Sequence, residues 1–74
     1  MQYFDAIAKV IADRTGYDVE SIAPDSSFKE LGIDSLDTVE MLMELEDIVG
    51  FQIDLDKATG TVQELDQYMQ SISK

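Results

Sequence analysis

Hydrophobic residues recur at helical spacing near both ends of the chain. In the first segment these positions are Tyr3, Phe4, Ile7, Val10 and Ile11. In the last segment they are Val62, Leu65, Tyr68, Met69 and Ile72. Gly16 follows the first pattern as a stop signal, and Thr61 with Glu64 forms a capping box in front of the last. We therefore expect one helix that ends near Thr15 and another that begins after Thr61.

A third helical pattern fills the middle of the chain. Asp34 is suited to the N-cap, Ser35 to the first helical position, and Gly50 to the end. A step of about 100° per residue divides this helix into two faces. The predicted core face holds Thr38, Met41, Leu42, Leu45, Ile48 and Val49. The opposite face carries three hydrophobic residues among acidic side chains, namely Leu36, Val39 and Met43.

Two connections complete the pattern. Segment 17–32 is long, so it is either functional or pinned down by its hydrophobic residues, which are Val19, Ile22, Phe28 and Leu31. Segment 54–59 has room only for a short turn of helix. No segment alternates with a period of two residues for long enough to indicate a sheet. We predict one all-α domain over residues 1–74, a small four-helix bundle with three main helices and a short third helix.

The composition excludes several classes of function. The 74 residues include neither cysteine nor histidine. These are the usual zinc ligands, and histidine is the commonest general base, so we expect no metal centre and no enzyme. The formal charge of −11 would repel nucleic acid and anionic membranes, and it favours basic protein surfaces as partners. No hydrophobic run is long enough to span a bilayer and no secretory signal is present, so we expect a cytoplasmic protein. We also expect it to be a monomer.

Acidic residues gather on the middle helix. Between Lys29 and Lys57 the chain carries no base and these acids: Glu30, Asp34, Asp37, Glu40, Glu44, Glu46, Asp47, Asp54 and Asp56. Glu40 and Glu44 are like charges four residues apart, which costs about 0.2–0.5 kcal/mol, and no base within the helix offsets them. Isolated surface hydrophobic residues and a solvated acidic face are common, but stability alone does not favour this pattern. We interpret the face as a docking surface.

Ser35 lies at the mouth of this helix. A serine there usually serves the helix itself, but Asp34 already fills the capping role. The Ser35 hydroxyl is then expected to be exposed where helix N–H groups favour a phosphate. The surrounding sequence "FKELGIDSLDTVEMLMELED" resembles the attachment segment of acyl carrier proteins of the bacterial fatty-acid type. The resemblance extends over essentially the whole chain.

The resemblance implies a covalent cofactor. In this family a magnesium-dependent transferase moves 4'-phosphopantetheine from coenzyme A onto the serine of Asp-Ser-Leu, which here is Ser35 between Asp34 and Leu36. The terminal thiol of the group then holds acyl chains as thioesters. The resemblance also implies that the transferase and the fatty-acid or polyketide enzymes bind the middle helix through basic surfaces. The matching positions are Leu36, Asp37, Val39, Glu40, Met43, Glu46 and Asp47.

In this family the acyl chain also enters a channel inside the bundle. The positions that could line it are Phe28, Thr38, Leu45, Ile53, Ala58 and Tyr68, although ordinary core packing explains the same residues equally well. The segment "DSLDTVE" fits fatty-acid and polyketide carriers better than peptidyl carriers. The stretch between Ile53 and Thr61 is shorter than is common in bacterial fatty-acid carriers. A carrier for polyketide or alanyl cargo and an unmodified acidic adaptor therefore stay open as alternatives.

Overall fold

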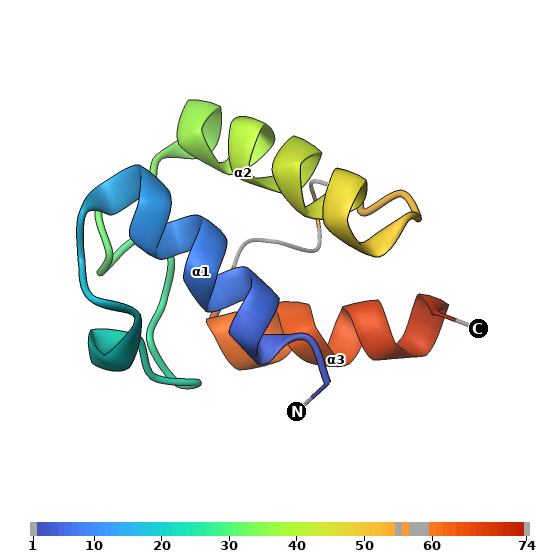
Figure 1. Ribbon diagram of the computed structural model, residues 1–74, viewed down its shortest axis with the longest axis horizontal. Helices are drawn as coiled ribbons and strands as arrows, with labels where there is room; N and C mark the ends of the chain where they lie inside the picture. Colours follow the sequence, from blue (N-terminus) through green and yellow to red (C-terminus); the bar gives the residue numbers. More distant parts are fainter. Residues whose placement is uncertain (1, 55, 57–59, 74) are drawn as a thin grey trace.

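Three α-helices and one short 3₁₀ helix make up the architecture. The computed structural model describes residues 2–54, 56 and 60–73. The elements in chain order are α1 (Phe4–Thr15), η1 (Val19–Ser21), α2 (Ser35–Val49) and α3 (Val62–Ile72), as Figure 1 shows. The all-α prediction is confirmed, and no strand occurs in the described ranges. The short helix predicted over 54–59 falls largely on residues 55 and 57–59, which lie outside them, so the four-helix count stays a prediction.

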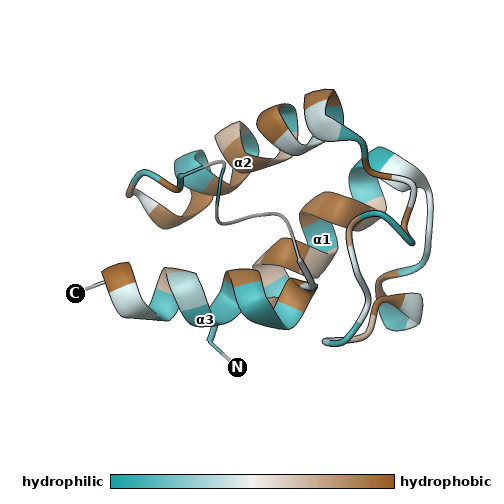
Figure 2. Cartoon of the chain, turned by 180° about the vertical axis from the view of Figure 1, so that it is seen from behind, coloured by the Kyte–Doolittle hydropathy of each residue, from teal (hydrophilic) through white to brown (hydrophobic). Residues whose placement is uncertain are grey.

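The core lies where α1 packs against both α2 and α3. Hydrophobic and hydrophilic bands alternate along each α-helix (Figure 2), and each helix turns its hydrophobic side inward. The buried hydrophobic residues of the three helices are Ile7, Ala8, Val10, Ile11, Met41, Leu42, Leu45, Val62, Leu65 and Met69. Both predicted helix ends are confirmed, because Gly16 and Gly50 adopt the left-handed conformation, each with φ of 83°, that glycine reaches without strain.

One residue of the predicted core face of α2 is wrongly placed. Ile48 is 57% exposed, and Val49 beside it is only half-buried. In Figure 1 the axes of α1 and α2 lie close at the start of α2 and diverge toward its end. Ile48 belongs to that end, so α1 does not cover it. Helical periodicity fixes the direction of a side chain around its own axis but not the extent of the neighbouring helix.

The long connection before α2 is held down by both its side chains and its backbone. Ile22 and Phe28 are buried and Leu31 is partly buried, as expected, whereas Val19 is 45% exposed and does not anchor the loop. The loop also supplies backbone acceptors to α3. Ser26 O accepts from Val62 N at 3.0 Å, and Pro24 O accepts from Gln63 N at 2.8 Å. These bonds satisfy N–H groups that the first turn of a helix leaves free.

The start of α3 also carries the predicted capping box. Thr61 Oγ1 accepts from Glu64 N at 3.2 Å, and Glu64 Oε1 accepts from Thr61 N at 3.1 Å. Glu64 folds back so closely that a Cβ on Gly60 would collide with its carboxylate. The absence of a side chain at Gly60 therefore makes room for the cap.

A buried carboxylate joins α3 to the beginning of α1. Asp66 is completely buried, and its Oδ1 accepts from the backbone N–H of Tyr3 at 2.6 Å. Its other oxygen accepts from Gln70 Nε2 at 2.6 Å. A negative charge near the first N–H groups of a helix also interacts favourably with the helix dipole. The hydrophobic pattern gave no sign of this contact, because Asp66 is a single polar residue on an amphipathic helix.

Candidate functional site

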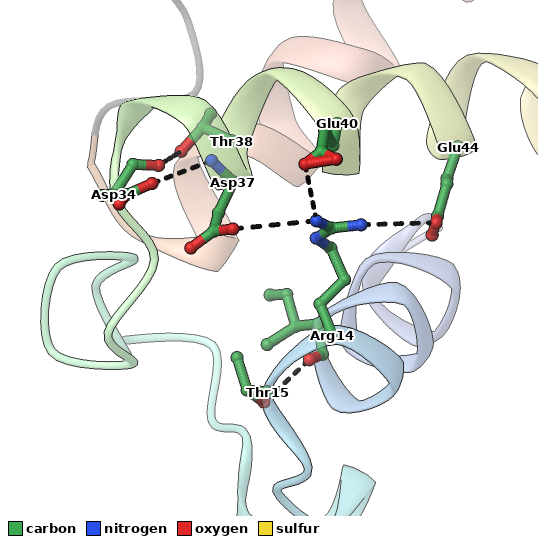
Figure 3. Close-up of polar contacts among 8 residues, drawn as sticks. Arg14, Thr15, Asp34, Asp37, Thr38, Glu40 and Glu44 are labelled. Carbon is green, nitrogen blue, oxygen red and sulfur yellow. Dashed lines mark hydrogen bonds and ion pairs between the residues drawn. The ribbon is translucent and has the colours of Figure 1, made fainter.

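The start of α2 is built by Asp34, as predicted. This residue has an extended backbone, and its Oδ1 accepts from Asp37 N at 2.9 Å. Its carbonyl oxygen accepts from the Thr38 hydroxyl at 2.8 Å (Figure 3). Both the side chain and the backbone of Asp34 therefore hold the first turn of the helix. The backbone turns into this helix at Gly32, where φ is 78°, and the buried side chain of Ile33 anchors the turn in the core. The position of the helix mouth is thereby fixed.

Ser35 is the first residue of α2, and it is exposed. Its hydroxyl makes no hydrogen bond to any other residue in the described part of the chain. The cap explains this, because Asp34 already satisfies the donor that a serine at a helix start would otherwise bind. The result is an accessible hydroxyl on a rigid element, beside the positive end of the helix dipole.

The outward face of α2 carries the exposed hydrophobic residues that the sequence predicts. Leu36 is 69% exposed, Met43 61% and Val39 38%. Asp47 is exposed beside them and makes no ion pair with any described residue. We call Leu36, Val39, Met43 and Asp47 the open stripe. It has the composition of a small docking surface, a hydrophobic centre with an acidic edge.

Three further acids of α2, which are Asp37, Glu40 and Glu44, are partly neutralised by a base from another helix. The sequence suggested that the charge of these acids is not offset, and this expectation is wrong. Arg14, in the last turn of α1, reaches across to α2 and contacts three carboxylates (Figure 3). Its Nη2 lies 3.0 Å from Glu40 and 3.7 Å from Asp37, and its Nη1 lies 3.6 Å from Glu44. We call Asp37, Glu40 and Glu44 the paired stripe. No base within α2 offsets these charges, but a base from another helix does.

Glu46 has a structural contact of its own. It is half-buried, and its Oε2 accepts from the backbone N–H of Ile53 at 2.8 Å. This bond ties the chain after α2 back onto the helix. Glu46 therefore differs from Asp47, its exposed neighbour, although the sequence assigned both to the same docking surface.

Most of the proposed channel residues lie in the core. Phe28, Thr38, Leu45 and Ile53 are buried, Tyr68 packs against the hydrophobic core from its edge, and Ala58 lies outside the described residues. A surface hollow of about 150 Å³ opens beside Ile53, lined also by Val39, Leu42, Met43 and Glu46. An enclosed hydrophobic cavity of this volume can hold benzene, whereas this hollow is open to solvent. Of the predicted channel residues that the structure describes, only Ile53 lines this hollow.

A second hollow of about 170 Å³ lies where the end of α1 approaches the start of α2. Its lining comes from the end of α1, the loop that follows, the turn before α2 and the first turn of α2: Arg14, Thr15, Tyr17, Leu31, Gly32, Ile33 and Asp37. The sequence gave no sign of this hollow, because its walls come from segments that only folding brings together.

Metal binding and membrane insertion each require particular structural features. Among the described residues, no group of three or more His, Cys, Asp or Glu side chains is placed to hold a metal ion. No helix in the described ranges is both long and hydrophobic enough to cross a membrane.

A small helical domain with an exposed hydroxyl at a helix mouth has the features of a carrier domain, which bears a group for other proteins to act on. The comparison with protein families identifies which carrier. Residues 5–69 match the family model described as the phosphopantetheine attachment site, so the chain belongs to that family. Proteins of this family carry a covalently attached 4'-phosphopantetheine, and the domain is a carrier rather than a catalyst. An exposed serine hydroxyl without a hydrogen-bonding partner among the described residues is chemically suited to a phosphate ester.

Proposed function

We propose that the chain is an acyl carrier protein of fatty-acid biosynthesis and that Ser35 bears its 4'-phosphopantetheine. The observation that supports this most is the exposed Ser35 hydroxyl at the mouth of α2, between the cap Asp34 and the exposed Leu36. The family match covers this position. When bound, the group supplies a terminal thiol that forms thioesters with acyl chains.

In the attachment reaction Ser35 Oγ forms a new bond to the phosphorus that bears the pantetheine in coenzyme A. The bond from this phosphorus to the nucleotide half breaks, and the hydroxyl proton passes to the transferase. The Ser35 hydroxyl makes no hydrogen bond to a carboxylate or any other base among the described residues, so we assign the base for this step to the transferase. The N-terminus of α2 favours the resulting phosphate, and Arg14 near Asp37 offsets part of the opposing acidic charge.

The proposed partners are the transferase and the fatty-acid synthesis enzymes, which bind α2 through basic surfaces. The contact residues are Leu36, Asp37, Val39, Glu40, Met43, Glu46 and Asp47. A carrier must leave each enzyme between steps. With a Kd of about 10 μM and an on-rate of about 10⁷ M⁻¹s⁻¹, the off-rate is about 100 s⁻¹, which allows rapid exchange. We place this exchange in the cytoplasm, with the carrier acting as a monomer.

The acyl chain is proposed to occupy a channel lined by Phe28, Thr38, Leu45, Ile53, Ala58 and Tyr68. Several of these are buried in the closed core, so the channel has to open by separation of packed side chains. The hollow beside Ile53 is the proposed entry, since it opens to the surface next to one of these residues. The polyketide and alanyl alternatives differ from this proposal in the cargo, not in the attachment residue.

Incubation with coenzyme A, magnesium and a broad-specificity phosphopantetheinyl transferase tests the attachment. Intact mass should increase by one phosphopantetheinyl group in the wild type and in Ser21→Ala, an exposed serine control, but not in Ser35→Ala. A gain that survives Ser35→Ala contradicts the assignment of Ser35. No gain in the wild type, with retained binding to basic proteins, favours the unmodified adaptor.

The cargo is tested by offering the modified protein to loading enzymes of different classes. A malonyl transferase and a condensing enzyme of fatty-acid synthesis should load and extend the carrier, and the acyl-protein mass reports each addition. An alanyl-loading ligase serves as the comparison. Efficient alanyl loading without malonyl loading would contradict the fatty-acid assignment while leaving the carrier role intact.

A further inference from the structure

Arg14 contacts three acidic side chains of α2 at once. Its guanidinium lies within 4 Å of three carboxylates at positions i, i+3 and i+7 of α2. The hydrogen bond to Glu40, at 3.0 Å, is the shortest of these contacts. One arginine fork is therefore distributed over the whole paired stripe rather than committed to one acid.

Arg14 is less exposed to solvent than the three acidic side chains that it contacts. The Arg14 side chain is 23% exposed, whereas those of Asp37, Glu40 and Glu44 are 44%, 50% and 49% exposed. The base is thus recessed between the helices while the acids remain accessible from outside. A cationic side chain of an approaching protein can reach the same carboxylates, but it meets a guanidinium already bound there.

We propose that Arg14 is an internal counter-ion that competes with the basic side chains of docking partners for the paired stripe. Its charge lowers the attraction of α2 for a cationic surface, so partners bind more weakly and dissociate faster than the acids of α2 alone would permit. The open stripe, with Asp47 free of any ion pair to a described residue, is the part of α2 that a partner engages without this competition. The inference rests on the proposed function for the identity of the cationic partner.

A purely structural role for Arg14 would have different consequences. If Arg14 only fastens α1 to α2, its removal lowers stability and leaves partner affinity unchanged or weakened. If it competes, its removal strengthens binding to cationic partners. Both roles can lower the melting temperature, so affinity and its dependence on salt are the measurements that separate them.

The affinity of the unmodified protein for the phosphopantetheinyl transferase is measured by calorimetry for Arg14→Gln and Lys9→Gln. Lys9 is exposed on the same helix and makes no ion pair with any described residue, so the two variants lose the same charge. Arg14→Gln should bind roughly threefold to tenfold more tightly at low salt, and Lys9→Gln should change affinity by less than about twofold. The gain should shrink as salt rises from about 0.01 M to 0.15 M, because the screening length falls from about 30 Å to about 8 Å.

The inference stays testable if Arg14→Gln is poorly folded, because in the wild-type background Glu40→Gln should weaken binding less than Asp47→Asn, whose carboxylate Arg14 does not contact. A coupling measurement on folded variants adds a second test. Arg14→Lys keeps the charge, so it should bind within about twofold of the wild type. Glu40→Gln should weaken binding more in the Arg14→Gln background than in the wild type, because Arg14 no longer competes for that carboxylate. Equal losses in the two backgrounds, or a gain in Lys9→Gln as large as in Arg14→Gln, would overturn the proposal.

The competition by Arg14 and the carrier role can fail independently, and the two failures give different results. If the transferase does not modify the wild type, the carrier role fails, and the competition is then measured with a synthetic amphipathic helix of lysine and leucine. If modification at Ser35 occurs but Arg14→Gln does not tighten binding to either probe, the carrier role stands and the competition is wrong.

Discussion

At the start of α2, two adjacent residues have different tasks. Asp34 closes the first turn through its carboxylate, which accepts from Asp37 N, and through its carbonyl, which accepts from the Thr38 hydroxyl. Ser35 takes no part in these bonds and stays exposed. Attachment of a group at Ser35, as proposed, would therefore break none of the bonds that close the first turn. The cap at Asp34 makes modification at Ser35 compatible with stability.

Replacement of Asp34 tests this division. Asp34→Ala should lower the free energy of unfolding by about 1 kcal/mol, the usual cost of losing an N-cap, as measured by urea unfolding. Asp34→Asn keeps an acceptor and should retain most of the stability. Equal destabilisation by both substitutions would show that the charge of Asp34, rather than its hydrogen bond, stabilises the helix.

The sequence allowed local contacts of this kind to be predicted, but not the contact of Arg14. The caps at Asp34 and Thr61 join residues three positions apart, so the sequence alone contains both partners. Arg14 and Glu40 are 26 positions apart, and only the packing of α1 on α2 brings them together. A basic residue in the last turn of a helix has a sufficient local explanation in the helix dipole, so nothing in the pattern pointed to α2.

At the scale of elements, α2 has an inner and an outer face with different purposes. Met41 is completely buried, whereas Met43 is 61% exposed. Met41→Ala should lower the free energy of unfolding by about 2–5 kcal/mol because it leaves a cavity. Met43→Ala should change it by about 0.5 kcal/mol or less. Chemical denaturation measures both.

Met43→Ala also tests whether partners bind the open stripe. Met43→Ala should weaken transferase binding even though the fold is intact, because it removes hydrophobic contact from the open stripe. Calorimetry on the folded variant provides the measurement. Unchanged affinity for Met43→Ala would show that partners do not use the hydrophobic part of this face.

The link between α3 and the first residues of α1 depends on one buried carboxylate. Asp66→Ala would leave the Tyr3 N–H and the Gln70 amide without their acceptor. We expect a loss of about 1–3 kcal/mol in the free energy of unfolding, the cost of an unsatisfied buried polar group. Asp66→Asn keeps one acceptor oxygen and should cost less. If both variants unfold thermally at the same temperature as the wild type, the hydrogen bonds of Asp66 do not stabilise the contact between these helices.

Element boundaries were predicted closely, whereas burial at element ends was not. Glycines and capping residues act on their own helix, which explains why the ends at Gly16, Gly50 and Thr61 match. Ile48 and Val19 are hydrophobic but exposed, because burial depends on which neighbour covers a position. Periodicity carries no information about the divergence of α1 from α2.

Over the whole molecule, acidic charge opposes compactness. The formal charge is −11 on a chain of 74 residues whose Cα radius of gyration is 10.8 Å. Divalent cations that associate diffusely with this surface should relieve the repulsion and stabilise the folded state. We expect the melting temperature at low ionic strength to rise on addition of magnesium, more than with sodium at equal ionic strength. A melting temperature that does not change with magnesium would contradict this prediction.

The all-α class and the start of α2 at Ser35 could be predicted from the sequence because both depend on short-range patterns. Helical periodicity identified α1, α2 and α3, and the Asp-Ser-Leu segment identified the helix mouth. The balance of charge across helices could not be predicted in the same way. Arg14 converts a row of acids that appears unpaired in the sequence into a partly neutralised surface, and this result exists only in the folded molecule.

The proposed carrier role depends on Ser35 as the attachment residue of the 4'-phosphopantetheine. The most direct measurement is fragmentation mass spectrometry of the wild-type protein after incubation with coenzyme A, magnesium and the transferase. We expect the added group to lie on Ser35 and on no other hydroxyl. Attachment to a different serine, such as Ser26 or Ser27 in the preceding loop, or no attachment at all, would contradict it.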